Sequence, residues 1–328
     1  MQILISEAAH ARIAGRLAAL GPDLDVVTIG PGGVLTRAGA TVDSASIDPE
    51  GYWISIDMVR SGLLPHVFSQ AQAGSNGKWA QLFAAGLDAF GFKQLIEKGL
   101  RVTKSTAQAP PIADYVMSHA LSLIHPIAEQ RAAQATHQWR RIGFREVAST
   151  RWLLVGFGAI GRNIAARLQP FGAHLTVVRN HPTPDPLAAE VRASGDLISL
   201  LPDADVVVLA LPANDASRGM ANEAFFQAMK PGAIFINIAR GSLVDEAALK
   251  AGLDRDQPAQ AVLDVFATEP LPEDAWFWDH PKVRVTAHCC NAGDGVDDRG
   301  DMLFLENLRR YRAGELLLNE ARPSEVGL

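Results

Sequence analysis

The sequence predicts an α/β protein with two doubly wound parallel sheets. Short apolar runs alternate with segments of helical periodicity along most of the chain, and this alternation is typical of a parallel sheet covered by helices on both faces. The alternation begins near the N-terminus and begins again at residue 151. A chain of 328 residues is too long for one typical domain and suits two.

The first series of elements occupies about the first hundred residues. Its strand candidates are short apolar runs, and they lie at residues 3–5, 25–29, 52–56, 79–83 and 100–103. Its helix candidates are residues 7–20, which end at Gly21-Pro22, and residues 89–98, which end at Gly99.

Residues 110–141 form a long helical segment that breaks near Pro126. A helix of this length between two βα series can serve as a connector and as a surface for oligomerisation. It can equally be a helix that faces the core, and the sequence leaves both interpretations open.

The second series starts at residue 151. Its strand candidates are again apolar runs, and they lie at residues 152–156, 175–178, 206–210, 233–238, 260–263 and 283–286. A helix opens directly after the first of these strands, and residues 245–250 form another.

Charge and composition argue against several classes of partner. The net charge is −6, so we expect neither nucleic acid nor an anionic membrane as a partner. No window approaches the roughly 20 apolar residues of a membrane helix, and the N-terminus lacks the pattern of a signal peptide. The two cysteines, Cys289 and Cys290, are adjacent, which favours a reducing cytoplasm over a disulfide-stapled fold. We expect both to be buried thiols and expect no metal site.

A glycine-rich loop follows the first strand of the second series. It has the pattern G-x-G-x-x-G and consists of Gly156, Phe157, Gly158, Ala159, Ile160 and Gly161. In such a loop the first glycine makes the tight turn, the second lets the backbone approach a pyrophosphate, and the third allows close packing of helix on strand. The N–H groups at the start of the helix then hold the phosphates. The loop and its strand–helix setting therefore predict a dinucleotide-binding Rossmann domain.

The end of the next strand predicts which dinucleotide is preferred. NAD-binding domains usually place an Asp or Glu about 20 residues after the loop to bind the ribose hydroxyls, but no acidic residue lies between Arg162 and Pro184. The strand ends instead at Arg179 and Asn180. Because a guanidinium attracts a 2′-phosphate, we expect NADP as the preferred cofactor, with NAD as the alternative. In the other interpretation, Arg179 stacks on the adenine or faces solvent.

At this point the chain resembles the D-isomer-specific 2-hydroxyacid dehydrogenases. The resemblance is carried, in chain order, by FAAGLDAF, TKSTAQAPPIADYVM, LLVGFGAIGR, NIARGSLVDEAAL, AVLDVFATEPLPEDAWFWDHPKVRVTAH and LFLENLRRYRAGE. It implies a Rossmann nucleotide domain, a flavodoxin-like substrate domain and an active site in the cleft between them. The substrate domain would be discontinuous, with residues 1–104 and 290–328, around a nucleotide domain of residues 105–289. The resemblance also implies a homodimer formed through the nucleotide domain.

The resemblance assigns catalysis to three residues that follow strands of the second series. Arg240 would bind the carboxylate and carbonyl of a small 2-keto acid, because its planar fork grips a carboxylate and keeps its charge. His288 would protonate the carbonyl oxygen during reduction and take the proton back in the reverse direction. Glu269 would bond the other ring nitrogen of His288, orient the ring and favour the imidazolium. Taken singly, Glu269 is better explained as a capping residue, and only the trio in family order favours catalysis.

Further residues are expected around the ligands. Pro212, Ile238 and Ala239 are expected along the cofactor. Asp264 resembles the residue that contacts the nicotinamide carboxamide, but it can equally be an aspartate that forms hydrogen bonds at a strand end. In the other domain, the backbone N–H groups of Ala85-Gly86 are expected to hold the substrate carboxylate.

The chain departs from the family pattern beside the catalytic histidine. Ala287 replaces a proline that is usual there, and Cys289-Cys290 replaces an apolar-small pair. Because these residues adjoin His288, the identity of the substrate is not determined by the resemblance. The sequence favours a reductase of the glyoxylate/hydroxypyruvate type. The alternatives are a non-catalytic, co-repressor-like NAD(P) sensor on the same fold and a plain doubly wound binding domain.

Overall fold

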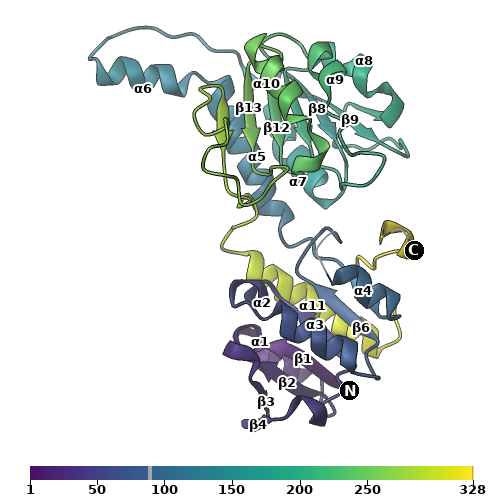
Figure 1. Ribbon diagram of the computed structural model, residues 1–328. Coiled ribbons are helices and arrows are strands. Elements are labelled where there is room, and N and C mark those ends of the chain that lie inside the picture. Colours follow the sequence, from purple (N-terminus) through teal and green to yellow (C-terminus); the bar gives the residue numbers. More distant parts are fainter. Residues whose placement is uncertain (88–90, 327) are drawn as a thin grey trace. The chain divides into compact units, whose positions relative to one another are not determined.

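The computed structural model describes residues 1–87, 91–326 and 328, and the chain divides into two compact units (Figure 1). Unit 1 contains Met1–Gln108 and Gly293–Leu328, and unit 2 contains Ala109–Ala292. The boundaries that the sequence predicts lie after residues 104 and 289. The assignment of substrate binding to the discontinuous unit stays a prediction.

Unit 2 contains a seven-stranded sheet in which every strand pair is parallel. From one edge to the other, the strands are β10 (Glu190–Ala193), β9 (His174–Arg179), β8 (Arg151–Val155), β11 (Val206–Leu209), β12 (Ile234–Asn237), β13 (Gln260–Leu263) and β14 (Val283–Val285). The chain runs from β8 outward to β10 and then returns to continue from β11 on the other side of β8. This reversal places a topological switch point at the carboxyl ends of β8 and β11, where open α/β sheets bind ligands.

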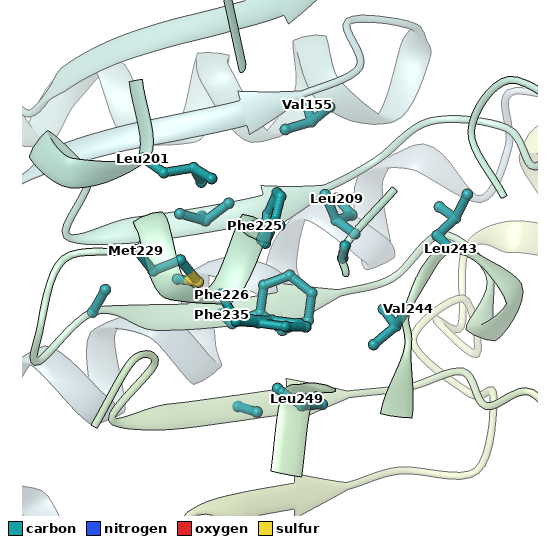
Figure 2. Packing of buried hydrophobic residues seen from close by; sticks show 14 of the residues in the cluster. Val155, Leu201, Leu209, Phe225, Phe226, Met229, Phe235, Leu243, Val244 and Leu249 are labelled. Carbon is teal, nitrogen blue, oxygen red and sulfur yellow. The ribbon is translucent and has the colours of Figure 1, made fainter. Parts of the chain in front are cut away.

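Helices cover both faces of this sheet, so its central strands, such as β11 and β12, are buried on both sides. Along β11, Val207 and Leu209 belong to one core cluster, whereas Val206 and Val208 belong to the other. Figure 2 shows the first cluster, in which Phe225 and Phe226 pack around the strands. The helices of unit 2 are α5 (Ala109–Ile124), α6 (Ile127–Ala135), α7 (Ala159–Leu168), α8 (Leu197–Leu200), α9 (Glu223–Ala228) and α10 (Glu246–Asp254).

Unit 1 contains a second seven-stranded sheet. Its five parallel strands have the order β2-β1-β5-β6-β7, which corresponds to the flavodoxin-like order 2-1-3-4-5. The parallel strands are β1 (Gln2–Ser6), β2 (Asp25–Ile29), β5 (Gly51–Ile54), β6 (Trp79–Leu82) and β7 (Arg101–Thr103). Strands β3 (Leu35–Arg37) and β4 (Ala40–Val42) extend the β2 edge in antiparallel pairing. The predicted α/β class is confirmed, but the antiparallel edge was not predicted.

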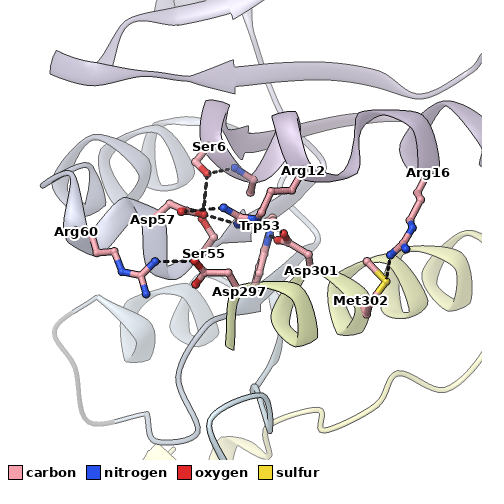
Figure 3. A network of polar contacts seen from close by, with 11 residues as sticks. Ser6, Arg12, Arg16, Trp53, Ser55, Asp57, Arg60, Asp297, Asp301 and Met302 are labelled. Atoms are coloured by element: carbon pink, nitrogen blue, oxygen red, sulfur yellow. Dashed lines mark hydrogen bonds and ion pairs between the residues drawn. The ribbon is translucent and has the colours of Figure 1, made fainter. Parts of the chain in front are cut away.

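A buried polar network joins helices of unit 1 (Figure 3). Asp301 is fully buried and accepts hydrogen bonds from Arg12 Nε at 2.6 Å and from Trp53 Nε1 at 2.8 Å. Arg12 also pairs with Asp57 at 2.7 Å. The network connects the two segments of the unit, because Asp301 belongs to the second. The helices of unit 1 are α1 (Glu7–Ala19), α2 (Ile56–Arg60), α3 (Leu64–Ala73), α4 (Phe92–Glu97) and α11 (Val296–Arg312).

Several elements differ from their predicted bounds. The predicted strand 52–56 ends at Ile54, because α2 begins at Ile56 with Ser55 at its N-cap position. The segment 110–141 forms α5 and α6, which ends at Ala135. Only α5 contributes a buried stripe, and α6 projects from the rest of unit 2 in Figure 1. The start of the predicted helix 89–98 lies outside the described residues. Short 3₁₀ helices span Pro31–Gly33, Ser44–Ser46, Val147–Ser149, Gln169–Phe171, Ser194–Asp196, Leu201–Asp203, Gly241–Leu243 and Pro323–Val326.

Within the described ranges, none of the helices combines the length and the apolar character needed to cross a membrane.

Candidate active site

The three glycines of the loop occupy three different environments at the switch point. Gly156 has a φ of +102°, and a Cβ added there would lie 2.3 Å from the carbonyl oxygen of Ala210, at the end of β11. A Cβ on Gly161 would lie 2.5 Å from the carbonyl oxygen of Gly156. A Cβ on Gly158 would meet nothing within 4 Å. The first and third glycines therefore permit close packing, while the second leaves open space of the kind that a pyrophosphate needs.

Helix α7 begins directly after Gly158, so Ala159, Ile160 and Gly161 form its first turn. The N–H groups of a first turn have no partner within their helix and favour an anion. The loop residue Phe157 is buried, and the Arg162 guanidinium lies 5.3 Å from the centre of its ring. This arrangement fits the phosphates of a dinucleotide.

The end of β9 carries the residues expected to select the cofactor. Arg179 is the last residue of β9 and is half-buried. Asn180 is exposed, and its side-chain oxygen accepts a hydrogen bond from Ser194 Oγ at 2.5 Å. Their contact with a cofactor stays a prediction.

A carboxylate that was not predicted, Asp185, lies after β9. Asp185 pairs with Arg162 and accepts a hydrogen bond from the N–H of Leu187 at 3.1 Å. The Arg162 hydrogen bond is the main cause that lowers the pKa of Asp185, and the charge of Arg179 lowers it further. Asp185 therefore stays ionised beside two arginines. Asp185 lies just after the stretch without acidic residues, so the expected spacing of about 20 residues between the glycine loop and an acidic residue does not find it.

His288 and Glu269 meet as an imidazole–carboxylate pair. His288 Nδ1 lies 2.7 Å from Glu269 Oε2, and the other oxygen of Glu269 accepts the N–H of Phe266 at 2.9 Å. Because a carboxylate only accepts, Nδ1 carries a hydrogen, and Nε2 is the ring nitrogen that can give or take a proton. The His288 side chain is 43% exposed, so it is open to a ligand.

The turn that carries His288 wraps around Asp264. His288 has a φ of +49°, a sparsely populated region for a residue with a Cβ. The fully buried Asp264 carboxylate accepts the N–H of Cys289 at 2.9 Å and that of Cys290 at 3.1 Å, and it also accepts the hydroxyl of Thr286 at 2.6 Å. The N–H of His288 donates to the Asp264 carbonyl at 2.8 Å. These contacts favour the strand-end interpretation of Asp264, and its contact with nicotinamide stays a prediction.

Arg240 lies in a loop that is fixed against the Glu269 segment. The Asn237 side chain accepts the N–H of Ala239 at 3.0 Å and donates to the Arg240 carbonyl at 3.0 Å. A Cβ on Gly241 would lie 1.9 Å from the carbonyl carbon of Phe266. Glycine at this position therefore lets the backbone after Arg240 approach the segment that leads to Glu269.

The other predicted ligand-binding residues occupy different settings. Ile238 and Ala239 are each 5% exposed and pack in the cores. Pro212 is exposed, and its carbonyl accepts the Ser217 hydroxyl at 3.0 Å. In unit 1, Ala85 and Gly86 lie in the loop after β6 and are exposed and half-buried, respectively. Their roles toward ligands stay predictions.

The prediction of two buried thiols was wrong for Cys289, which is exposed. Cys290 is buried, and this burial raises the pKa of its thiol, as does the nearby Asp264 carboxylate. The two differ because the turn around Asp264 directs one side chain outward and the next into the core. Among residues 1–87, 91–326 and 328, the structure contains no cluster of side chains suited to a metal ion.

Comparisons with known proteins show the family of the chain. Residues 117–290 match the family model of the D-isomer specific 2-hydroxyacid dehydrogenase, NAD binding domain. The chain is 32% identical to a D-3-phosphoglycerate dehydrogenase of Mycobacterium leprae over 71% of this chain and 44% of that protein. It is 29% identical to a glyoxylate/hydroxypyruvate reductase A of Serratia proteamaculans over 56% of this chain and 59% of that protein. The chain thus spans less than two thirds of the length of these two relatives.

Among solved structures, the fold is similar to a D-isomer specific 2-hydroxyacid dehydrogenase from Xanthobacter autotrophicus Py2, solved with NADPH and MES. The TM-score is 0.78 with 26% identity over 98% of each chain. The chain belongs to the D-isomer specific 2-hydroxyacid dehydrogenase family.

Proposed function

We propose that this protein is an NAD(P)-dependent oxidoreductase that transfers a hydride between nicotinamide and carbon 2 of a small 2-keto or 2-hydroxy acid of D configuration. The observation that carries the proposal is the hydrogen bond of 2.7 Å between His288 and Glu269. This acid–base pair lies in loops that follow β13 and β14, and the glycine loop that fits a dinucleotide follows β8 of the same sheet.

Arg240, His288 and Glu269 each have a separate role in the proposed reaction. Reduced nicotinamide, when bound, supplies the hydride to the carbonyl carbon. Arg240 binds the substrate carboxylate and polarises the carbonyl. His288 gives its Nε2 proton to the carbonyl oxygen, and Glu269 stabilises the imidazolium before this transfer. In the direction of oxidation, His288 Nε2 takes the hydroxyl proton. The backbone N–H groups of Ala85-Gly86 are proposed as further hydrogen-bond donors to the substrate.

We further propose a preference for NADP and for substrates of the glyoxylate and hydroxypyruvate type. Arg179 at the end of β9 supports the cofactor preference, as does the NADPH bound by the Xanthobacter protein. The name of the Serratia relative supports the substrate type. A panel of 2-keto acids assayed with NADPH and with NADH tests both preferences. Reduction confined to NADH and to the phosphorylated 2-keto acid that corresponds to 3-phosphoglycerate would reject them.

Replacement of the catalytic histidine separates an enzyme from a sensor. His288→Asn should lower kcat by roughly 10²- to 10⁴-fold, the usual effect of losing a general acid–base. His137→Asn is the matched control, because His137 is an exposed histidine with a similar φ of +54° and asparagine tolerates this conformation. A wild-type protein that binds NADPH but never oxidises it with any 2-keto acid would instead be a nucleotide sensor.

We also propose that the enzyme is a cytoplasmic homodimer that associates through the surface around α6. Trp139 is fully exposed in the segment after α6, and Phe144 is 53% exposed. Phe144 also lines a groove of about 480 Å³, together with Leu121 and Phe171. Exposed apolar residues around a groove are typical of an interface, and a second copy presents the same surface. Sedimentation of Trp139→Lys should show monomer, whereas Trp278→Lys, at another exposed tryptophan, should leave a dimer; a wild-type monomer would overturn the proposal.

A further inference from the structure

We propose that Tyr115 is a positioning residue for His288 and acts through Thr286 and Asp264. This inference rests on the proposed function, because His288 is the residue that is positioned. Tyr115 lies on α5, far in sequence from the catalytic turn, and its hydroxyl lies 2.7 Å from Thr286 Oγ1.

The Asp264 carboxylate, which is the last acceptor in this series of hydrogen bonds, determines the direction of each of them. Asp264 as a carboxylate only accepts, so the Thr286 hydroxyl donates to it at 2.6 Å. Since Thr286 has one hydroxyl proton, the Tyr115 hydroxyl must be the donor in the remaining contact. Burial raises the pKa of Tyr115, so the phenol keeps this proton in the neutral range.

This series of hydrogen bonds ends at the turn that carries His288. The carboxylate that accepts from Thr286 also accepts the N–H groups of Cys289 and Cys290, the two residues after His288. The backbone of His288 occupies a left-handed conformation that is sparsely populated for a residue with a Cβ. Such a conformation persists only where its surroundings determine it, and here the surroundings are the contacts to Asp264.

Tyr115 therefore fixes the rotamer of Thr286 and the placement of the Asp264 carboxylate, which in turn fixes the turn. Without the phenol hydroxyl, Thr286 can rotate to another acceptor, and the carboxylate loses one of its donors. We expect His288 Nε2 to lie outside productive range more often. Cofactor binding at the glycine loop should not change, because that loop is part of a different segment.

Kinetics with paired variants test the proposal. Tyr115→Phe and Thr286→Val should each lower kcat by roughly tenfold with KM and NADPH affinity within about twofold of wild type, whereas Thr286→Ser should retain kcat because it keeps the hydroxyl. The double variant should lose no more than the worse single variant, since both act on one chain of bonds. Tyr311→Phe is the matched control, because Tyr311 also donates from a half-buried hydroxyl, at 2.8 Å to Glu50 in unit 1.

Wild-type kcat in both Tyr115→Phe and Thr286→Val would overturn the inference. So would a loss in kcat that tracks only the fraction of folded protein, measured by thermal unfolding. NMR of histidine-labelled protein gives a readout independent of turnover. The ring signals of His288, assigned by their loss in His288→Asn, should change in Tyr115→Phe and not in Tyr311→Phe. Wild-type protein without turnover rejects the proposed function, while the NMR comparison still decides the positioning by Tyr115.

Discussion

Gly158→Ala should weaken cofactor binding without destabilising the protein. The added Cβ would meet no atom within 4 Å, and the backbone at Gly158 has a φ of −81° and a ψ of −159°, in the extended region open to alanine. Replacing glycine at a compatible position raises stability by about 0.4–1 kcal/mol through the unfolded chain. The same methyl, however, occupies the space that a pyrophosphate needs to reach the backbone.

The size of the effect follows from the contacts that the methyl disturbs. A hydrogen bond to a charged group contributes about 1.5–3 kcal/mol. The loss of one N–H bond to a phosphate therefore weakens binding roughly 10- to 150-fold. Fluorescence titration with NADPH gives the dissociation constant, and urea unfolding gives the stability.

Gly15→Ala is the matched control for this pair of measurements. Gly15 also has nothing within 4 Å of an added Cβ, but it lies on α1 of unit 1. It should gain stability and leave the titration unchanged. Gly158→Ala with wild-type NADPH affinity would refute the assignment of the open space to the pyrophosphate, and a large loss of stability would show that the space is not open.

Three further predictions concern unit 2. Gly161→Ala should destabilise by about 1–3 kcal/mol in urea unfolding, because its Cβ would lie 2.5 Å from the carbonyl oxygen of Gly156; unchanged stability would contradict this packing. Arg179→Asp should move the ratio of NADPH to NADH affinity toward NADH by about tenfold or more, as two titrations would show, and a constant ratio would reject the 2′-phosphate contact. Burial raises the pKa of Asp205, but hydrogen bonds led by that from Lys230 outweigh it and lower the pKa below its ordinary value. This pairing stabilises the fold above about pH 4 and is lost as the pH falls, so Lys230→Met should cost about 1 kcal/mol or less at pH 7 and less still near pH 3; an equal deficit at both pH values would contradict the pairing.

The sequence predicted the parts of the fold that rest on local pattern. Buried strands such as β11, with four apolar residues in succession, and the glycine loop with its strand and helix were all predicted. The hairpin β3–β4 was missed because its strands have three residues each and are partly exposed. No alternation of apolar residues extends far enough there to distinguish a strand from a loop.

The pairing of Glu269 with His288 was predicted from resemblance, and the surroundings of the pair were not. Nothing in the spacing of Glu269 and His288 shows that their side chains meet at 2.7 Å. The partners of Asp264 depend on the carboxyl ends of β13 and β14 lying side by side, which is a property of the sheet. Tyr115 lies within a motif that carries the resemblance, but the contact of its hydroxyl with Thr286 depends on how α5 packs, which the motif does not predict.

Unit 1 is made of two separate segments of the chain, and this constrains the order of folding during translation. Trp53 and Gln81 emerge early from the ribosome, yet their buried partners Asp301 and Asn307 arrive only after the whole of unit 2 has been synthesised. Trp79 likewise waits for the ring of Phe304, which stacks on it at 5.6 Å. Unit 2 is continuous and can complete its cores first, while the nascent N-terminal segment keeps apolar and polar surface uncovered. A stop codon ahead of α11 would therefore leave a folded unit 2 attached to residues 1–108, which would be prone to aggregation.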